Sequence, residues 1–172
     1  IKTSHKRGYR FAVTVSTRSS HVAASDRVMP KQVIQFCTSS DGTRIAYARA
    51  GSGPPIVKTG NWMNHLEFDW DSPVWSHLLR ALAEGRELIR YDARGNGLSD
   101  WDVEDISFDA FVRDLEAVAD AAKLDRFALF GASQGCAFSI AYAVKHPDRV
   151  SKLVLYGGFA RGRRMRGSPV DE

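Results

Sequence analysis

The sequence GASQG at residues 131–135 lies between a short apolar run, Arg126–Phe130, and an Ala-rich stretch. A chain that passes directly from a strand into a helix at a serine strains the serine backbone, and the neighbouring backbones then lie too close for side chains at Gly131 and Gly135. The same turn pushes the Ser133 hydroxyl out beside the free N–H groups of a helix N-terminus. We therefore expect Ser133 to be a nucleophile. The alternative is a Gly-Ser turn that only packs.

From residue 32 onward, strand patterns alternate with helix patterns. Short apolar or β-branched runs predict strands at Val33–Thr38, Arg44–Ala50, Pro55–Thr59, Glu87–Tyr91, Arg126–Phe130 and Val150–Tyr156. Apolar residues at helical spacing predict helices over Val74–Leu82, over a stretch capped by Ser107, and over Gln134–Lys145. The first two strands flank Asp41-Gly42, which suits the tight turn of an antiparallel hairpin. The alternation predicts the α/β fold class, with a mostly parallel sheet covered by helices on both faces.

The first 31 residues differ from the rest of the chain. Residues 1–15 predict a β-hairpin, because two β-branched or aromatic runs flank a polar turn that contains Gly8. Residues 16–31, rich in Ser, Ala and Thr, predict a linker, which leaves 32–172 as the main domain. Residues 1–31 carry a net charge of +6, whereas the whole chain carries +4. This basic N-terminal part favours a polyanion as partner.

Several classes of protein are disfavoured by the composition. No apolar run approaches the roughly 18–20 residues of a membrane span, and no signal peptide is recognisable, so we expect a cytoplasmic protein without a membrane partner. Cys37 and Cys136 lack any CxxC or Cys/His spacing and are expected to be reduced packing residues. We expect no metal and no other cofactor. The chain begins at Ile1 without Met and stops at Glu172 in a polar stretch, so we expect a fragment of a longer protein.

A second motif, DARGNGLSD at residues 92–100, follows the predicted strand Glu87–Tyr91. Together with the later GASQG, it resembles the α/β-hydrolase superfamily, and KTGNWMNHLEFDWDSPVW at 58–75 resembles the subgroup that is fused to regulatory domains. The resemblance covers about residues 32–160. It implies ester or related acyl hydrolysis of a small-molecule substrate by Ser133, at a nucleophile elbow. Asp92 and Arg94 are expected to brace a loop beside the site.

The resemblance also implies an oxyanion hole made of two backbone N–H groups. One is that of Gln134, and the other comes from the loop after Pro55–Thr59. That loop begins with His-Gly in most relatives but with Thr59-Gly60 here, so the second donor is expected to be Asn61, with Trp62 as the alternative. Packing of the loop is the competing interpretation of both residues.

In this superfamily an acid and then a histidine follow the serine along the chain. The only histidine after Ser133 is His146, and a helix of that length places it roughly 18 Å from the serine, so we expect a helix-end residue. His65 and His77 precede the serine and would need an unusual arrangement. We expect the later strands, the acid and the histidine to be missing from these 172 residues, and 161–166 to begin a lid.

Two segments of the N-terminal part have a resemblance of their own. Ile1-Lys2-Thr3 and Gly8-Tyr9-Arg10-Phe11 are similar to the closing hairpin of the winged-helix DNA-binding domain of response regulators of the OmpR/PhoB type. The resemblance implies DNA as a partner, with weak contacts from Lys6, Arg7 and Arg10 to the DNA backbone. The helix that reads bases would precede Ile1. An arbitrary basic hairpin is the alternative.

These observations predict an incomplete α/β-hydrolase domain, joined to the remnant of a winged-helix domain in a transcriptional regulator. A rival hypothesis from another class is a sensor, in which the hydrolase fold binds a ligand without catalysis. A third hypothesis is a peroxidase-like use of the same serine. Fold alone does not separate them.

Overall fold

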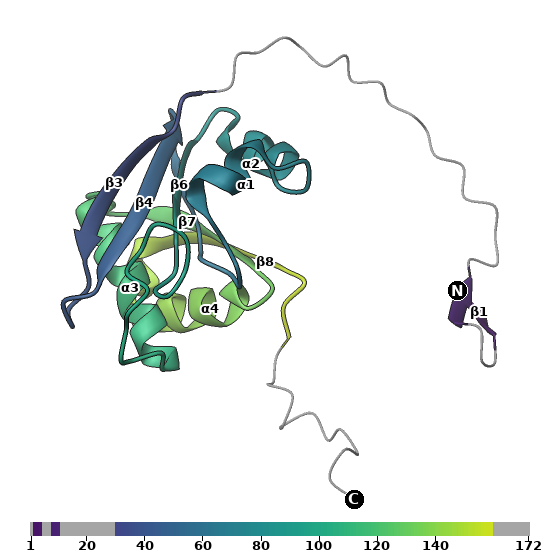
Figure 1. Cartoon of the computed structure of the whole chain (residues 1–172). Coiled ribbons are helices and arrows are strands. Elements are labelled where there is room, and N and C mark those ends of the chain that lie inside the picture. The colour runs from purple at the N-terminus through teal and green to yellow at the C-terminus, as the bar shows by residue number, and fades with distance from the viewer. Residues whose placement is uncertain (1, 5–7, 11–29, 160–172) are drawn as a thin grey trace, which may run out of the picture.

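The computed structural model describes residues 2–4, 8–10 and 30–159. Residues 30–159 form a layered α/β domain around one six-stranded sheet (Figure 1). In chain order its elements are β3 (Val33–Thr38), β4 (Arg44–Gly51), β5 (Pro55–Lys58), α1 (Leu66–Asp71), α2 (Ser76–Ala83), β6 (Glu87–Tyr91), α3 (Phe108–Ala121), β7 (Phe127–Ala132), α4 (Gly135–Lys145), the single-turn 3-10 helix η1 (Pro147–Arg149) and β8 (Val150–Tyr156). Each of the six predicted strands is present, with ends shifted by at most two residues.

The sheet is mixed, with the strand order β3-β4-β6-β5-β7-β8. The strands β6, β5, β7 and β8 are parallel to one another, whereas β4 runs antiparallel to both of its neighbours. The prediction of a mostly parallel sheet is confirmed by those four strands, and the predicted antiparallel hairpin is confirmed at the β3–β4 end. The hairpin closes at the predicted tight turn, in which Gly42 has a φ of +89° and sends the chain straight back along β3.

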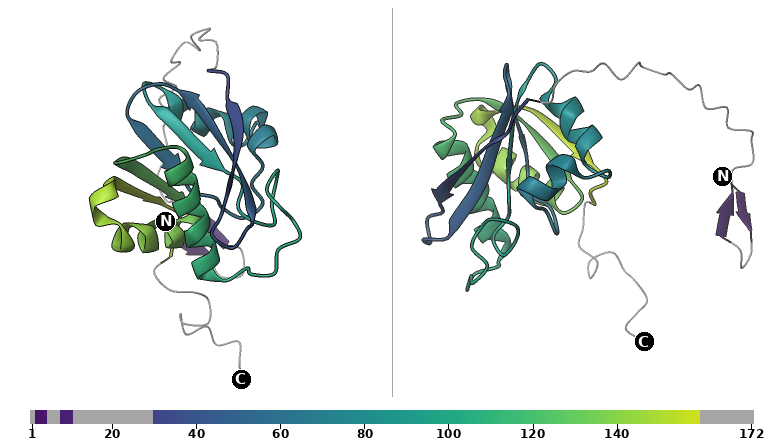
Figure 2. Two further views of the ribbon diagram at one scale, coloured as in Figure 1. Left: turned by 90° about the vertical axis from the view of Figure 1, so that its left-hand side faces the viewer. Right: turned by 45° about the horizontal axis from the view of Figure 1, so that its top comes forward.

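Helices cover both faces of the sheet, as predicted (Figure 2). On one face, α3 and α4 contribute Leu115, Val118 and Tyr142 to a buried cluster with residues of β4 to β7. On the other face, Trp70 of α1 and Leu79 of α2 pack over strand residues that include Ile56, Leu88 and Phe130. The parallel strands therefore lie between two packed layers of helices.

Two helices differ from the prediction. The helix α1 was not expected: it has only six residues, and the ring of His65 caps it by accepting hydrogen bonds from the backbone N–H groups of Glu67 and Phe68 at 3.2 and 3.4 Å. The helix α2 begins at Ser76, two residues later than predicted. The cap of α3 is as predicted, with the Ser107 hydroxyl accepting from the Ala110 N–H.

The N-terminal strands β1 (Lys2–Ser4) and β2 (Gly8–Arg10) pair antiparallel, with Lys2 opposite Arg10, so the predicted hairpin is confirmed as a hairpin. Lys6 and Arg7 lie outside the described residues, as do residues 11–29 of the predicted β-run and linker and residues 161–166 of the predicted lid.

Cys136 is buried on α4, where its thiol donates to the carbonyl oxygen of Gly131 at 3.2 Å, and Cys37 is half-buried. Both are free thiols, as expected. Within the described ranges, no helix has the length and apolar character needed to cross a bilayer, and no group of three or more His, Cys, Asp or Glu side chains is arranged to hold a metal ion.

One buried ion pair joins three segments of the domain. The Arg94 guanidinium, completely buried, donates to both carboxylate oxygens of Asp114 on α3, at 2.8 and 2.6 Å. It also donates to Asp41 in the β3–β4 turn and to the carbonyl oxygen of Asp105, at 2.7 and 2.8 Å. The hydrogen bond from Arg94 lowers the pKa of Asp41 below its ordinary value. Arg94 therefore braces its loop, as expected.

Removing one partner of this pair should be costly. We expect Asp114→Asn to lower the free energy of unfolding by about 3 kcal/mol, because a buried guanidinium loses its carboxylate. Urea unfolding followed by circular dichroism measures the change. The control is Asp120→Asn on the same helix, which breaks a surface pair with Arg149 and should cost under about 1 kcal/mol. Equal losses for the two variants would contradict a stabilising role for the buried pair.

Candidate active site

Ser133 lies in the sharp turn between β7 and α4 with a φ of +51°, in the left-handed region that L residues rarely adopt. Its N–H donates to the carbonyl oxygen of Tyr156 on β8 at 2.9 Å, and its carbonyl accepts from the Cys136 N–H at 3.1 Å. The backbone is thus held on both sides, while the residue is exposed. No residue that the structure describes forms a hydrogen bond to the Ser133 hydroxyl.

The two glycines of the motif are needed for clearance. A Cβ at Gly131 would lie 2.8 Å from the Cα of Cys136, and a Cβ at Gly135 would lie 2.6 Å from Oγ1 of Thr59. Carbon atoms do not approach this closely without a shift of the backbone. The reason given for the glycines from the sequence is therefore confirmed.

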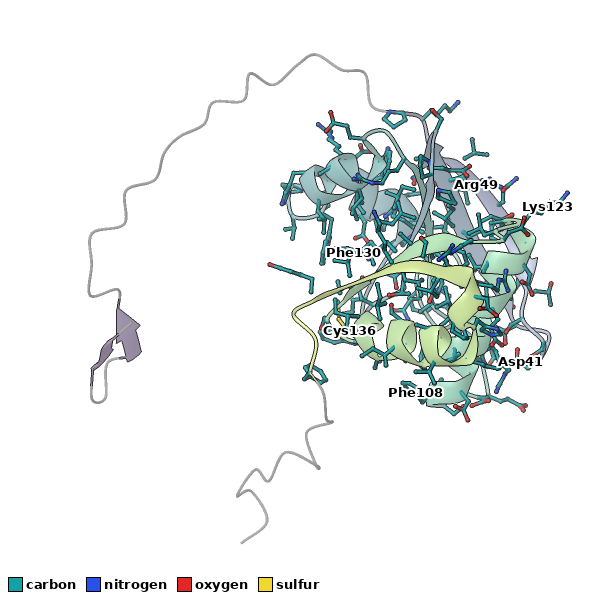
Figure 3. All side chains as sticks on the ribbon, turned by 180° about the vertical axis from the view of Figure 1, so that it is seen from behind. Asp41, Arg49, Phe108, Lys123, Phe130 and Cys136 are labelled. Atoms are coloured by element: carbon teal, nitrogen blue, oxygen red, sulfur yellow. The ribbon has the colours of Figure 1, made fainter. Side chains whose placement is uncertain are left out.

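The loop after β5 packs directly against the first turn of α4. The Thr59 N–H donates to the carbonyl oxygen of Phe130 at 3.0 Å, and its hydroxyl lies 3.1 Å from both the carbonyl oxygen of Gly135 and the hydroxyl of Ser139. Figure 3 shows the start of α4 at Cys136 on the opposite side of the domain from Asp41 in the β3–β4 turn. Thr59 thus ties this loop to the turn that contains Ser133.

The residues expected to supply the oxyanion hole flank this contact. Gln134 is exposed and caps α4, and Asn61 is 9 % exposed in the loop that packs on the elbow. Neither backbone N–H donates a hydrogen bond within the described part of the chain, so both are free to bind an anionic oxygen. The alternative donor, Trp62, is 74 % exposed, and Met63 beside it has a φ of +56°.

Lys58, the last residue of β5, was not predicted from the sequence to belong to the site. Its side chain is almost fully buried, and its Nζ donates to Oδ1 of Asn61 at 2.6 Å. Asn61 in turn donates from Nδ2 to the carbonyl oxygen of Trp62 at 3.2 Å. The signal in the sequence is a lysine that directly continues an apolar strand, where a cation is unusual.

Asp92 supports the same loop from the other side. Its buried carboxylate accepts hydrogen bonds from the Asn64 side chain at 2.7 Å and from the N–H groups of Leu66 and Leu98 at 3.2 and 2.9 Å. Burial raises the pKa of Asp92, and the two backbone hydrogen bonds oppose that shift. Asp92 therefore braces the loop beside the candidate site, as expected, through Asn64, Leu66 and Leu98.

The three histidines of the described residues are engaged elsewhere. His65 caps α1 and stacks on Phe68, with ring centroids 4.1 Å apart, and His77 is exposed on α2. His146 lies at the end of α4, with Nε2 2.6 Å from a carboxylate oxygen of Glu116, as its helix-end position predicted. None of them reaches Ser133 with a hydrogen bond.

Comparison with known proteins identifies the family of this fold. Residues 63–169 match the family model of the alpha/beta hydrolase fold, which is more than half of the chain. The chain belongs to the α/β hydrolase fold family. The match begins after residues 1–31 and does not bear on the winged-helix resemblance.

Three relatives indicate the range of this family. The chain is 29 % identical over 123 residues to pyrrolizixenacetamide deacetylase of Xenorhabdus hominickii, covering 72 % of this chain and 44 % of the relative. It is 35 % identical over 123 residues to a non-heme haloperoxidase of Rhodococcus erythropolis, covering 71 % and 43 %. Among solved structures, an esterase of Exiguobacterium antarcticum superposes with a TM-score of 0.63 at 31 % identity, covering 74 % and 46 %. The hydrolase-fold chain thus spans less than half the length of each.

The strained backbone of Ser133 gives a test of the elbow. We expect Ser133→Gly to have a free energy of unfolding about 0.5–1 kcal/mol higher than Ser133→Ala, because alanine keeps a Cβ at a left-handed φ and glycine does not. Urea unfolding measures both. The control is Ala137→Gly inside α4, where the same exchange should lower stability by about 0.5–1 kcal/mol. A glycine variant less stable than the alanine variant at residue 133 would rule out backbone strain there.

Proposed function

We propose that the protein is a serine hydrolase that cleaves esters or related acyl bonds of small-molecule substrates with Ser133 as the nucleophile. The observation that carries the proposal is the geometry at residue 133. An exposed serine is fixed at a positive φ at the N-terminus of α4, directly before Gln134, and the loop that contains Asn61 packs on the same turn. The backbone N–H groups of Gln134 and Asn61 donate no hydrogen bond within the described residues. Stabilisation of a developing oxyanion by such donors is a large part of acyl-transfer catalysis.

The reaction would proceed in two acyl transfers. The Ser133 oxygen attacks the carbonyl carbon while its proton passes to a histidine base, and the tetrahedral oxyanion binds the N–H groups of Gln134 and Asn61. The alcohol then leaves with the proton from the histidine, and the acyl group stays on the Ser133 oxygen as an acyl-enzyme. Water then releases the acid by the reverse sequence and regenerates the serine. We propose that the base and its acid lie in a part of the protein beyond residue 172, because this chain spans less than half of its relatives.

The related haloperoxidase favours a second outcome at the same serine. If hydrogen peroxide replaces water as the attacking group, the acyl-enzyme gives a peracid in place of the acid, and no other atom of the scheme changes. A third hypothesis is a sensor, in which the hydrolase fold binds a ligand without turnover. The free oxyanion donors favour an active site over a sensor.

We further propose that the hydrolase domain is fused to a transcriptional regulator that contacts DNA. The observation in favour is the hairpin of β1 and β2, whose register sets Lys2 opposite Arg10. We propose that Lys6 and Arg7, which lie between the two strands in the sequence, contact DNA phosphates together with Arg10. The protein would then be cytoplasmic, with the domains 1–15, 16–31 and 32–172 predicted from the sequence.

The hydrolase proposal is tested in the longer protein to which we propose this chain belongs. We expect it to hydrolyse short p-nitrophenyl esters, and we expect Ser133→Ala to lower kcat by several orders of magnitude, because nucleophile and base act as one unit. Absorbance of the released p-nitrophenolate measures both rates. The 172-residue chain alone should not exceed the background rate, since its described residues bring no base to Ser133.

The matched control is Ser151→Ala, which removes an exposed hydroxyl near the start of β8 and should leave the rate unchanged. An active protein with an unchanged rate after Ser133→Ala would move the chemistry to another residue. A protein inactive on a broad ester panel, with and without hydrogen peroxide, that binds DNA in a ligand-dependent way would establish the sensor instead.

The DNA proposal has its own test. In the longer protein, Lys6→Gln and Arg7→Gln should each reduce the slope of log K against log salt concentration by about 0.9 for duplex DNA, because each removes one phosphate contact. Fluorescence anisotropy at several salt concentrations measures the slope. Arg80→Gln, at an exposed position of α2, is the control and should leave it unchanged. Slopes equal to that of the unmodified protein for all three variants would exclude the hairpin as a DNA contact.

A further inference from the structure

Lys58 occupies an unusual place for a cation. It is 5 % exposed at the carboxyl end of β5, in the middle of the sheet, and its Nζ has one hydrogen-bond partner among the described residues, the neutral amide oxygen of Asn61 at 2.6 Å. No described carboxylate lies within ion-pair distance of it. A buried ammonium is normally paired with a carboxylate, because the attraction offsets the cost of removing the charge from water. Lys58 has a neutral amide as its hydrogen-bond partner, so this cost is offset less.

The surroundings of Lys58 are aromatic and cationic. The ring of Trp75, the N-cap residue of α2, lies 5.5 Å from Nζ. Arg90 on the neighbouring strand β6 is also buried, but its guanidinium is already bound to the Gln32 side chain and the carbonyl oxygen of Leu66, both at 2.8 Å. Arg90 is therefore satisfied by its own partners. The one hydrogen bond that the Lys58 ammonium donates within the described residues therefore goes to the Asn61 side chain.

That side chain belongs to the loop on which the candidate oxyanion hole depends. Thr59 fixes the beginning of the loop on the elbow, whereas Asn61 lies two residues further on, where the chain has left the sheet. The amide of Asn61 is held at both ends, by Nζ of Lys58 at Oδ1 and by the carbonyl oxygen of Trp62 at Nδ2. A fixed side chain restricts the backbone torsions of its own residue, and so the direction of its N–H.

We propose that Lys58 is a positioning residue of this site: through its hydrogen bond to the Asn61 side chain it fixes the loop so that the Asn61 backbone N–H faces the oxyanion. This inference rests on the proposed hydrolase function. Lys58 does not touch the substrate, and its contribution passes through Asn61. A preorganised donor needs no rearrangement as negative charge develops, which is why a bond made away from the reacting atoms can accelerate the reaction.

The same contact makes activity depend on pH. Burial, and next the charge of Arg90 on β6, lower the pKa of Lys58 to about 8, while Asp69 on α1 and Asp92 after β6 oppose the shift. Trp75 faces Nζ from α2 and does not titrate. A charged donor binds an amide oxygen about twice as strongly as a neutral one. As pH rises through about 8, Lys58 loses its proton, the loop is held less firmly, and kcat falls.

The experiment measures kcat, KM and the pH profile of p-nitrophenyl ester hydrolysis by the longer protein. Lys58→Met should lower kcat by about tenfold or more at neutral pH, less than the about 10²–10³-fold loss of an oxyanion donor itself, and should leave KM nearly unchanged. It should also remove the alkaline fall of kcat near pH 8. Lys152→Met, at an exposed position of β8, is the matched control and should keep both the rate and the alkaline fall.

Asn61→Ala provides a second route, because it removes the side-chain acceptor and keeps the backbone N–H. It should reproduce the loss in kcat, and the double variant Lys58→Met/Asn61→Ala should be no slower than either single variant, since both break one contact. Thermal unfolding by circular dichroism shows which variants are folded. If Lys58→Met does not fold, Asn61→Ala decides by its kcat.

The outcomes separate this proposal from the hydrolase proposal. Suppose that Ser133→Ala abolishes turnover, but that folded Lys58→Met keeps the rate and the alkaline fall of the unmodified protein. Lys58 is then not a positioning residue, and the hydrolase proposal stands. Where Lys58→Met does not fold, the same result for Asn61→Ala leads to the same conclusion. Additive losses in the double variant would also overturn the positioning proposal. If the unmodified protein has no esterase activity that depends on Ser133, the hydrolase proposal itself fails.

Discussion

The close approach of the end of β5 to the first turn of α4 governs the rest of this site. Thr59 bonds to the carbonyl oxygen of Gly135, and the space between the two segments leaves no room for a side chain at residue 135. At the same turn β7 enters α4 through Ser133, which has a left-handed φ. The loop that follows Thr59 contains Asn61 and begins at this contact. The candidate nucleophile and the candidate oxyanion donors therefore lie on two segments that one packing contact joins.

Much of the fold was predictable because its signals are local. Each strand is a short apolar run bounded by turn residues, and the cap of α3 needed only Ser107 ahead of a helical apolar pattern. The turn at Ser133 was predictable for a different reason: a direct strand-to-helix turn leaves no room for side chains at residues 131 and 135, and both are glycine in the sequence. The bracing roles of Asp92 and Arg94 also followed from the motif that contains them, and both are hydrogen-bonded as braces.

What could not be predicted depends on residues that meet only in three dimensions. The helix α1 is shorter than two helical turns, so it shows no period, and its cap is a histidine ring. In the sequence, Lys58 is simply a polar residue at the end of a strand. Its contact with the ring of Trp75, the N-cap residue of α2, is visible only in the folded domain. The hairpin of β3 and β4 was predicted from Asp41-Gly42, but the antiparallel pairing of β4 with β6 joins segments far apart in the sequence and has no local signal. Whether the N–H of Asn61 is free depends on the loop path, which no local pattern encodes.

The burial of Lys58 also links folding to proton release. Burial lowers its pKa to about 8 in the folded protein, from the ordinary lysine value of 10.5. Between these values the unfolded chain keeps the proton and the folded domain does not, so folding releases a proton and this residue makes the domain more stable as pH rises. Below about pH 8 the domain bears the full cost of an enclosed charge. A cation that orders the loop therefore does so at the expense of global stability, and the two quantities change in opposite directions over the same pH interval.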